Sequence, residues 1–413
     1  MKASQVNVCI TPSSYDEKSL AGFSVRSNSS LSLGEQNLYI SVTWLKDASS
    51  RSVVVISIDA LYIDEILASE VYGYLEDKYG VSFSRVIFNA SHTHSAPSIC
   101  NDIFGFEDEI HKEQLVQAIK KAADTAFNNL KGEVVRFCRF SLPTDLVVNR
   151  RLYARDIKAL FMRKKIIMAP NYGGYVDARC RLLVIGSDVG ILFNLSCHPV
   201  FNTSNSISSD FPGSIRRMLA SNFKGAAFVQ GFCGDIRPNS VSRGITFISP
   251  VLFIKTLINK ISFKPATSSY YESFCKQISK AIIQHSASGS KLQGNIRTKH
   301  FLVELRSDTG LCKKILDCKL VLIDKLLMLS IPAEVNSKYI QLIENEFTCL
   351  VVMPMGYAEN MIGYLPHWSE VNDGGYEVES YSNYGWDKKI SIQSLKEMES
   401  KMLNEIREIQ KEV

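Results

Sequence analysis

The chain has 413 residues, of which 46% are hydrophobic and 22% are charged. These fractions are typical of a globular protein with a sizeable core, and they exclude an intrinsically disordered chain. The formal net charge of +5 is small for this length, and the basic residues form no long stripe with interleaved aromatic side chains, so we expect no nucleic-acid partner. No run approaches the roughly 18 consecutive apolar residues of a membrane span, so we also expect no transmembrane segment.

Short apolar strands alternate with longer helices along the chain. The strands are predicted at 52–59, 85–89, 190–196 and 226–230. Apolar residues at helical spacing predict helices over 63–78 and 107–130, and Asp210-Phe211-Pro212 is typical of a helix start. The strands end at polar clusters. Because open α/β sheets carry their sites at the carboxyl ends of strands, we expect the functional residues there.

The domain organisation predicted from this pattern is simple. We find no internal repeat and no low-complexity linker, so residues 1–413 are expected to form a single catalytic domain. Residues 240–294 carry apolar side chains at helical spacing between weak polar clusters, which predicts a helical insertion. The expected fold class is α/β, a layered mixed-sheet domain of the hydrolase type.

The cysteines bear on the compartment. The ten cysteines include no CxxC pair, and several lie inside apolar runs, so we interpret them as buried thiols in a reducing compartment. The first residues, Met1 to Cys9, lack the apolar stretch of a secretory signal. We therefore expect a cytoplasmic protein.

Two histidine segments are the first candidates for chemistry. His92 and His94 form an HxH pair directly after a strand, where alternate residues of an extended chain point the same way. His198 ends another apolar strand, just before a proline. Zinc favours neutral imidazole nitrogens and commonly adds a carboxylate. A polar strand end and a satisfied core histidine are the alternatives, but two strands that both end in histidine favour a metal site.

A third segment, residues 229–239, contains two glycines that allow a close approach of the backbone. Asp235 and Asn239 in this segment can fix nearby amide groups by side-chain hydrogen bonds. From the residues alone, a tight structural turn and a site loop are equally good interpretations.

Three further residues have two interpretations each. Asp59 follows a strand and either holds a ligand histidine or caps the next helix. Asp210 favours a helix cap over a catalytic base. His367 either reaches the mouth of a pocket or lies on a loop.

These segments together resemble the neutral (alkaline, non-lysosomal) ceramidase family. Asn89 to Ser95 reads Asn-Ala-Ser-His-Thr-His-Ser and is similar to the family's ASHTHSGP signature, and Gly234 to Asn239 is similar to its GDVSPN loop. Four shorter elements occur in the family's order: Asn149-Arg150, Cys197-His198-Pro199, Ile331-Pro332-Ala333-Glu334 and Gly363-Tyr364-Leu365-Pro366. The resemblance covers most of the chain with the family's N-terminal catalytic domain, and we expect no C-terminal immunoglobulin-like domain.

The resemblance implies a Zn²⁺ site with four protein ligands: His92, His198, Glu334 and Tyr364. Two histidines, a carboxylate and a phenol leave room for a water or a substrate oxygen, as a catalytic zinc site requires. Metal-activated water would then attack an amide carbon.

The resemblance also implies roles for residues beside the metal. His94 is the candidate for proton transfer, because an imidazole titrates near neutral pH. His94, Asn149 and Arg150 would bind the substrate, and the loop supplies Asp235 and Arg237 as further candidate catalytic residues. Arg237 stands where the family has a serine, and a guanidinium cannot replace a serine nucleophile. We therefore expect Arg237 to bind the substrate or its oxyanion.

The predicted function is a zinc-dependent amidohydrolase that cleaves the amide of an N-acylated small molecule, a lipid or an amino sugar. Two alternatives remain open. One is a pseudoenzyme that binds a ligand through Arg150 and Arg237 without turnover. The other is an esterase or acyltransferase that uses the same metal site and differs only in the leaving group or acceptor.

Overall fold

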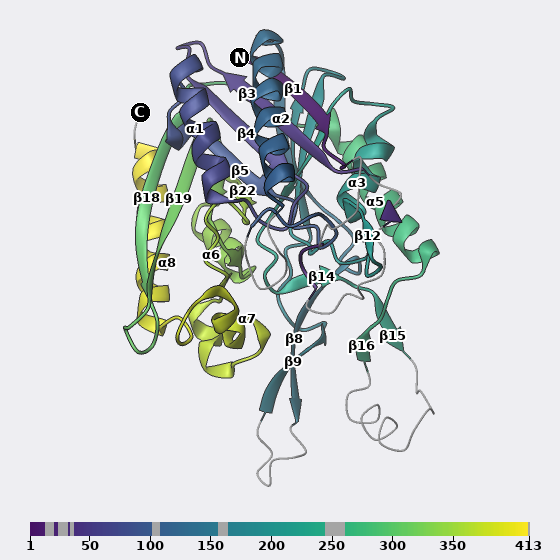
Figure 1. Ribbon diagram of the computed structural model, residues 1–413, viewed down its shortest axis with the longest axis vertical. Coiled ribbons are helices and arrows are strands. Elements are labelled where there is room, and N and C mark those ends of the chain that lie inside the picture. Colours follow the sequence, from purple (N-terminus) through teal and green to yellow (C-terminus); the bar gives the residue numbers. More distant parts are fainter. Residues whose placement is uncertain are drawn as a thin grey trace.

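Three sheets with helices on their outer faces make up the body of the protein (Figure 1). The computed structural model describes residues 1–12, 20–23, 32–33, 37–100, 108–155, 164–243 and 261–411. The predicted α/β class with mixed sheets is confirmed, because each of the three sheets contains both antiparallel and parallel pairs.

The three sheets are three copies of one topology. In each copy three antiparallel strands are followed by a helix and a fourth strand, which pairs parallel to the third. The first copy is β1 (Lys2–Cys9), β3 (Tyr39–Lys46), β4 (Ser52–Ile58), α1 (Glu65–Tyr79) and β5 (Val86–Ala90). The second is β7 (Val135–Ser141), β10 (Arg179–Ile185), β11 (Gly190–Leu195), α3 (Asp210–Leu219) and β13 (Ala226–Gln230). The third is β18 (Arg297–Arg306), β19 (Lys313–Ile323), β20 (Leu326–Ser330), α6 (Lys338–Glu346) and β22 (Val351–Met355).

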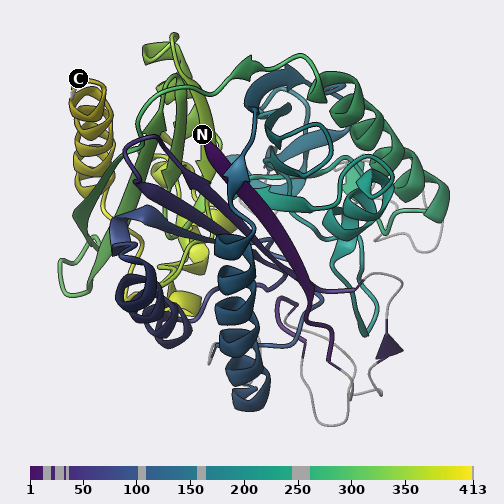
Figure 2. The same cartoon turned by 90° about the horizontal axis from the view of Figure 1, so that it is seen from above.

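A further helix follows each copy and packs on its first two strands. These helices are α2 (Glu109–Asn128), α5 (Ser268–Ser286) and α8 (Ile392–Lys411). Seen from above, they lie around the outside of the sheets, α2 in blue, α5 in green and α8 in yellow (Figure 2). The expectation of no internal repeat is therefore wrong at the level of topology. The repeat is absent from the residue pattern because a shared topology requires only that the same faces be apolar.

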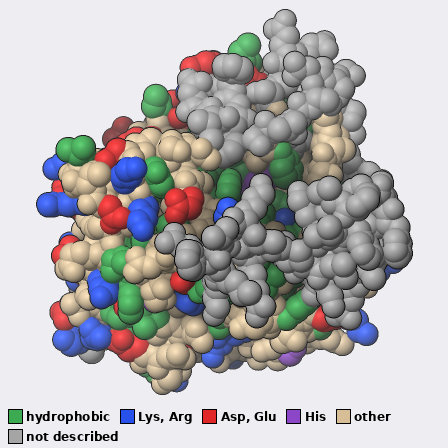
Figure 3. Space-filling model, turned by 90° about the horizontal axis from the view of Figure 1, so that it is seen from below, with side chains coloured by type: hydrophobic (Ala, Val, Ile, Leu, Met, Phe, Trp, Pro, Cys, Tyr) green, Lys and Arg blue, Asp and Glu red, His purple; other side chains and the backbone are tan. Residues whose placement is uncertain are grey.

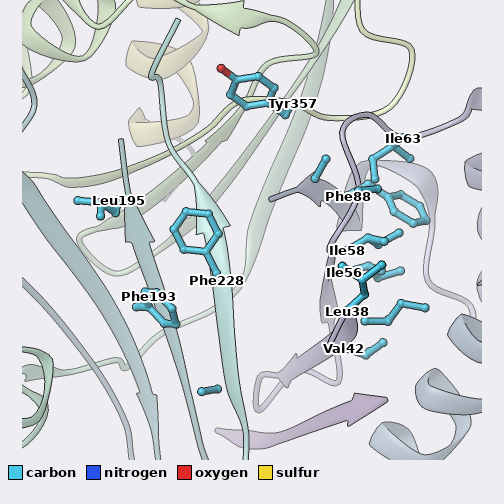
Figure 4. Close-up of a cluster of buried hydrophobic side chains, with 14 of the residues drawn as sticks. Leu38, Val42, Ile56, Ile58, Ile63, Phe88, Phe193, Leu195, Phe228 and Tyr357 are labelled. Carbon is cyan, nitrogen blue, oxygen red and sulfur yellow. The ribbon is translucent and has the colours of Figure 1, made fainter. Parts of the chain in front are cut away.

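Both faces of the three sheets are buried, which explains the continuous apolar runs of the sequence. Val53 and Val55 of β4 face a central core to which all three sheets contribute, whereas Val54 and Ile56 face an outer core under the helices. This alternation follows from the two-residue period of a strand. In the outer core, Phe228 of β13 packs between the strands of the first two copies (Figure 4).

The carboxyl ends of the parallel strands meet at one place between the three sheets. Asn89 lies near the end of β5. Its side-chain amide donates to the carbonyl oxygens of Gln230 (3.1 Å) and Gly356 (2.6 Å). The backbone N–H of Gly356 donates to the same Gln230 carbonyl at 3.1 Å. Because these buried polar groups satisfy one another, the three strand ends are fixed together and the loops that follow them converge.

The predicted elements of the first half agree with the structure to within a few residues. The strands and helices expected near residues 52, 63, 85, 107, 190, 210 and 226 are β4, α1, β5, α2, β11, α3 and β13. The region 240–294 differs from the predicted helical insertion. Its described ends are the strand pair β15 (Val241–Arg243) and β16 (Ile261–Phe263) and the short strand β17 (Ser290–Lys291), while the expected helix around Ile254–Ile258 lies outside the described residues.

The helix α5 is the part of this region that was expected and is found. Its Phe274, Ile278 and Ile282 are fully buried in the outer core, against α3 and the second sheet. It is therefore an integral element of the second copy. Among the described residues, no helix has both the length and the apolar character needed to cross a membrane. The ten cysteines are all free thiols.

Candidate metal centre

His92 follows β5 in an unusual backbone conformation. Its φ is +62°, in the left-handed region that a β-carbon disfavours. Two hydrogen bonds to the loop after β4 hold it there, from its backbone N–H to Ala60 (2.9 Å) and from ring Nδ1 to the carbonyl of Leu61 (3.0 Å). Strained residues of this kind cluster at functional sites. Since a carbonyl can only accept, Nδ1 carries the proton and the Nε2 lone pair is left facing the centre.

His198 lies in the second copy and is held in the same way. It follows β11, its side chain is buried, and its Nδ1 donates to the carbonyl of Ile236 at 3.0 Å. The residue Ile236 belongs to β14 (Ile236–Pro238), which pairs with β8 (Val147–Arg155). The Nε2 lone pair of His198 therefore also faces the centre.

Glu334 comes from the third copy, four residues after the end of β20. It begins β21 (Glu334–Val335), which pairs parallel with β23 (Tyr364–Leu365) so that Glu334 and Tyr364 are register partners. Its Oε2 is 3.2 Å from Nε2 of His198 and 3.5 Å from Nε2 of His92. Gly234 makes this approach possible, since a β-carbon there would lie 2.7 Å from the Glu334 carbonyl oxygen.

The donor atoms of these three residues fit one metal ion. Two atoms that share a tetrahedral zinc ion at its usual bond lengths are roughly 3.3 Å apart, close to the spacings of Glu334 Oε2 from the two imidazoles. Burial lowers the pKa of His92 to about 4 and also lowers that of His198. Burial would raise the pKa of Glu334, but the two histidines and Arg150 lower it below its usual value. Near neutral pH, two imidazole lone pairs therefore face a carboxylate, an arrangement that could hold a cation.

His94 completes a group of three histidines, each of which offers one ring nitrogen within 4.8 Å of the other two, so His92, His94 and His198 could hold a metal ion. Its Nε2 is 3.2 Å from Nε2 of His92, and its ring is only partly buried. Gly22, at φ +103°, lies against this ring, where a β-carbon would be 2.7 Å from Cγ. Burial lowers the pKa of His94 well below its ordinary value, so it is a neutral base near pH 7.

A second group of buried charges lies beside the histidines, and we call Arg150, Arg151, Glu370 and Glu377 the arginine–glutamate cluster. Arg150 Nε donates to Glu377 at 2.7 Å, Arg151 Nη1 donates to the other Glu377 oxygen at 2.6 Å, and Arg151 Nε lies 3.0 Å from Glu370. Arg150 Nη2 donates to the hydroxyl of Tyr364 at 2.9 Å. The cluster therefore orients the phenol of Tyr364, which is the strand register partner of Glu334.

The structure has a close match among solved proteins, whereas the sequence alone has none. No protein-family model and no curated protein matches the sequence. The fold matches neutral ceramidase from Pseudomonas aeruginosa with a TM-score of 0.71 and 16% identity, over 97% of this chain and 73% of that chain. It also matches a ceramidase complexed with C2, with a TM-score of 0.72 and 15% identity, over 97% of this chain and 74% of that one.

The chain has the neutral ceramidase fold. The resemblance seen in the short motifs is thus confirmed at the level of the fold. Within this neutral ceramidase fold, His92, His198, Glu334 and Tyr364 come together from separate segments of the chain, as the resemblance implies. Their role as ligands stays a prediction.

Asn149 of β8 and the loop residue Asp235 lie beside the centre and bind each other. Asn149 Nδ2 donates to Asp235 Oδ2 at 2.7 Å, and the backbone N–H and hydroxyl of Ser337 donate to the same carboxyl group at 2.7 and 2.9 Å. Burial raises the pKa of Asp235 to about 7. These bonds tie β8 to the segment that follows Glu334, which gives both residues a positioning role. Direct substrate binding by Asn149 and catalysis by Asp235 stay predictions.

Arg237 lies on β14, one residue after the carbonyl that holds His198. Its guanidinium carbon is 4.1 Å from the centre of the Phe263 ring, and its buried Nε has no hydrogen-bond partner among the described residues. Burial, and then repulsion from Arg150, lowers its pKa to about 10. Seen from below, the molecule shows histidine and basic side chains near the middle of this face (Figure 3).

Three tyrosines around Glu334 were not found from the sequence. The hydroxyls of Tyr384 (2.9 Å) and Tyr62 (3.3 Å) donate to Oε1, and that of Tyr357 donates to Oε2 at 3.4 Å. Tyr62 and Tyr384 also line a cavity of ≈ 640 Å³, so they stand between the cavity and the carboxylate. No local spacing singles out Tyr384, which is 50 residues from Glu334.

The remaining candidates, Asp59, Asp210 and His367, each contact another residue outside the metal centre. Asp59 forms a buried ion pair with Arg216 and accepts from the backbone of Tyr39, so both interpretations of Asp59 are wrong. The pair forms because a buried carboxylate requires a compensating charge, and α1 is capped by Asp64 instead. Asp210 binds backbone N–H groups at the start of α3, as expected of a capping residue. His367 lies 3.2 Å from Glu399 of α8, on a loop.

Proposed function

We propose that this protein is a zinc-dependent amidohydrolase that cleaves the amide bond of an N-acylated small molecule. The observation that carries the proposal is the facing of two imidazole lone pairs and one carboxylate at 3.2 to 3.5 Å. Groups arranged in this way repel one another unless a cation lies between them. The neutral ceramidase fold supports an amide as the bond that is cleaved.

Zinc suits this donor set, because neutral imidazoles and a carboxylate are its usual ligands in hydrolases. We propose His92, His198 and Glu334 as ligands, with Tyr364 as the fourth. The carbonyls of Leu61 and Ile236 fix the ring orientation of the two histidines before any metal binds. When bound, the metal would supply Lewis acidity, which polarises a carbonyl group and makes water nucleophilic near neutral pH.

The chain's own residues complete the reaction. Water adds to the amide carbon, its proton passes to the neutral Nε2 of His94, and the C–N bond breaks as that proton moves to the leaving amine. The products are a carboxylic acid and an amine. Arg150 keeps Tyr364 beside Glu334 and contributes positive charge near the developing oxyanion. Because Arg237 cannot act as a nucleophile, no covalent acyl-enzyme is expected.

Two measurements on the same protein test this proposal. Protein purified without chelator is assayed for bound metal, and it is then incubated with N-acyl amides of varied acyl length and head group while amine release is followed. We expect about one zinc ion per chain and amine release that chelator abolishes and added zinc restores. A metal-free native protein that turns over none of the amides would favour the ligand-binding alternative and overturn the proposal.

The esterase alternative uses the same residues, so it is tested with matched substrates. An ester and an amide that share one acyl group differ only in the leaving atom. The proton-donating position of His94 matters more for an amine than for an alkoxide, because an amide nitrogen leaves only when protonated. We therefore expect His94→Ala to reduce amide cleavage more than ester cleavage.

A further inference from the structure

The guanidinium of Arg237, beside the proposed metal site, differs in its partners from those of Arg150 and Arg151. The arginines of the arginine–glutamate cluster each have a carboxylate within 2.7 Å. Arg237, in contrast, forms no ion pair and no side-chain hydrogen bond with any residue that the structure describes, and its Nε is buried. A buried guanidinium N–H group that lacks an acceptor is costly and therefore uncommon.

The position of Arg237 is fixed by its neighbours. Its strand β14 pairs with β8, where it is the register partner of Val148, and the preceding residue Ile236 accepts the Nδ1 proton of His198. Phe263 covers one face of the guanidinium at 4.1 Å. Stacking of this kind holds the planar group in one orientation and leaves its N–H edge to bind a ligand.

The local charge around Arg237 is positive. Arg150 lies near enough to lower the pKa of Arg237, whose value of about 10 still leaves it charged at neutral pH. Arg150 is neutralised by Glu377, but Arg237 is not neutralised by a described carboxylate. The sequence between β15 and β16, residues 244–260, contains no Asp or Glu. The nearest connection along the chain therefore offers no acidic side chain either.

We propose that Arg237 binds an anionic oxygen group of the substrate, in the simplest case a carboxylate, so that the enzyme selects negatively charged N-acyl compounds over neutral ones. The planar fork of a guanidinium matches the two oxygens of a carboxylate. This inference rests on the proposed amidohydrolase function and specifies its substrate class.

A matched pair of substrates tests the selection. N-hexanoylglycine and N-hexanoylglycinamide differ only in the charge of the group beyond the scissile amide. We expect the wild-type kcat/KM to be about 30-fold higher for the acid. In Arg237→Met the ratio of the two kcat/KM values should fall to near one, mostly through KM, while Arg237→Lys keeps part of the preference. The control Arg306→Met removes an exposed arginine on β18 and should leave the ratio unchanged.

Binding to the metal-free protein gives a readout that does not depend on turnover. In calorimetric titrations after chelation, the wild type should bind the acid more tightly than the amide, and Arg237→Met should lose this difference. If the preference is found but the zinc-loaded enzyme hydrolyses neither compound, the inference stands and the proposed function fails. If both compounds are hydrolysed and bound equally well by the wild type, the function stands and the inference is overturned. Should Arg237→Met fail to fold by circular dichroism, Arg237→Lys and the wild-type comparison decide.

Discussion

His92, His94, His198 and Glu334 form a site that we call the histidine centre. It lies beside the arginine–glutamate cluster, and the two groups differ in one respect. Every charge of the arginine–glutamate cluster has an opposite charge within 3.0 Å. In the histidine centre, acceptor faces acceptor: the Nε2 lone pairs of His92 and His198 face the Glu334 carboxylate at 3.2 to 3.5 Å. The charges of the first group neutralise one another, whereas the second group could hold a metal ion.

This difference distinguishes the residues that stabilise the fold from those that we expect to act in the reaction. Breaking a complete buried pair leaves an uncompensated charge and destabilises the fold. Removing a group from an incomplete site relieves repulsion, so it costs activity more than stability, which is the usual trade at functional sites. The arginines differ in the same way, since Arg150 and Arg151 are paired with carboxylates while Arg237 has no described carboxylate partner.

The largest expected effect is on turnover in His92→Ala. Loss of this imidazole should lower kcat/KM for the best N-acyl amide by about 1,000-fold and should reduce bound zinc well below one per chain. The free energy of unfolding measured in chelator should change far less. His300→Ala, which removes a half-exposed histidine outside the centre, is the control and should leave turnover unchanged. Full turnover in His92→Ala would show that the histidine centre is not the catalytic site.

A change in the arginine–glutamate cluster should have the opposite signature. In Glu377→Gln, Arg150 and Arg151 lose their shared carboxylate, and the free energy of unfolding in urea should fall by about 3 kcal/mol. Zinc binding should persist in the variant that remains folded. Glu304→Gln removes an exposed carboxylate that also pairs with two basic residues, and it should leave the unfolding midpoint unchanged. Equal midpoints for Glu377→Gln and the wild type would remove the distinction between the two regions.

The sequence predicts those residues of the histidine centre that lie at strand ends. His92 and His198 follow apolar strands directly, so their convergence could be inferred from the strand pattern. Glu334 and Tyr364 could not, because both lie in short strands of two residues whose pairing depends on the third sheet. They were found only through the resemblance to neutral ceramidases.

What the sequence could not give is set by contacts between distant segments. The threefold topology depends on which faces are buried, so the three copies need no shared residues. The tyrosines around Glu334 come from segments that follow β4, β22 and β23, and no spacing relates Tyr62 to Tyr384. The unpaired state of Arg237 is likewise visible only once the partners of the neighbouring arginines are known.

Acidification should weaken the metal-free protein through the histidine centre. The pKa of His92 is about 4 in the folded state and 6.5 ordinarily, so between these values the unfolded chain binds more protons. Stability is therefore fully present above pH 6.5 and is lost as the pH falls toward 4. Urea titrations in chelator at pH 7 and pH 4.5 should differ by roughly 2 kcal/mol through this residue. His92→Ala should show a smaller difference, and an identical pH dependence in the two proteins would contradict this assignment.

The smallest expected effect is that of Tyr384→Phe, which tests whether the tyrosines belong to the functional region or to its support. The variant removes the hydroxyl that donates to Glu334 Oε1 at 2.9 Å and keeps the ring that packs on Tyr364. One hydrogen bond to a carboxylate contributes about 1.5 kcal/mol, so kcat/KM should fall roughly tenfold and zinc should bind correspondingly less tightly. The unfolding midpoint should stay near that of the wild type. Tyr381→Phe serves as the control, because Tyr381 lies on the same short 3₁₀ helix, Ser380–Tyr384. A large loss of stability in Tyr384→Phe with unchanged turnover would place Tyr384 with the arginine–glutamate cluster, as part of the scaffold.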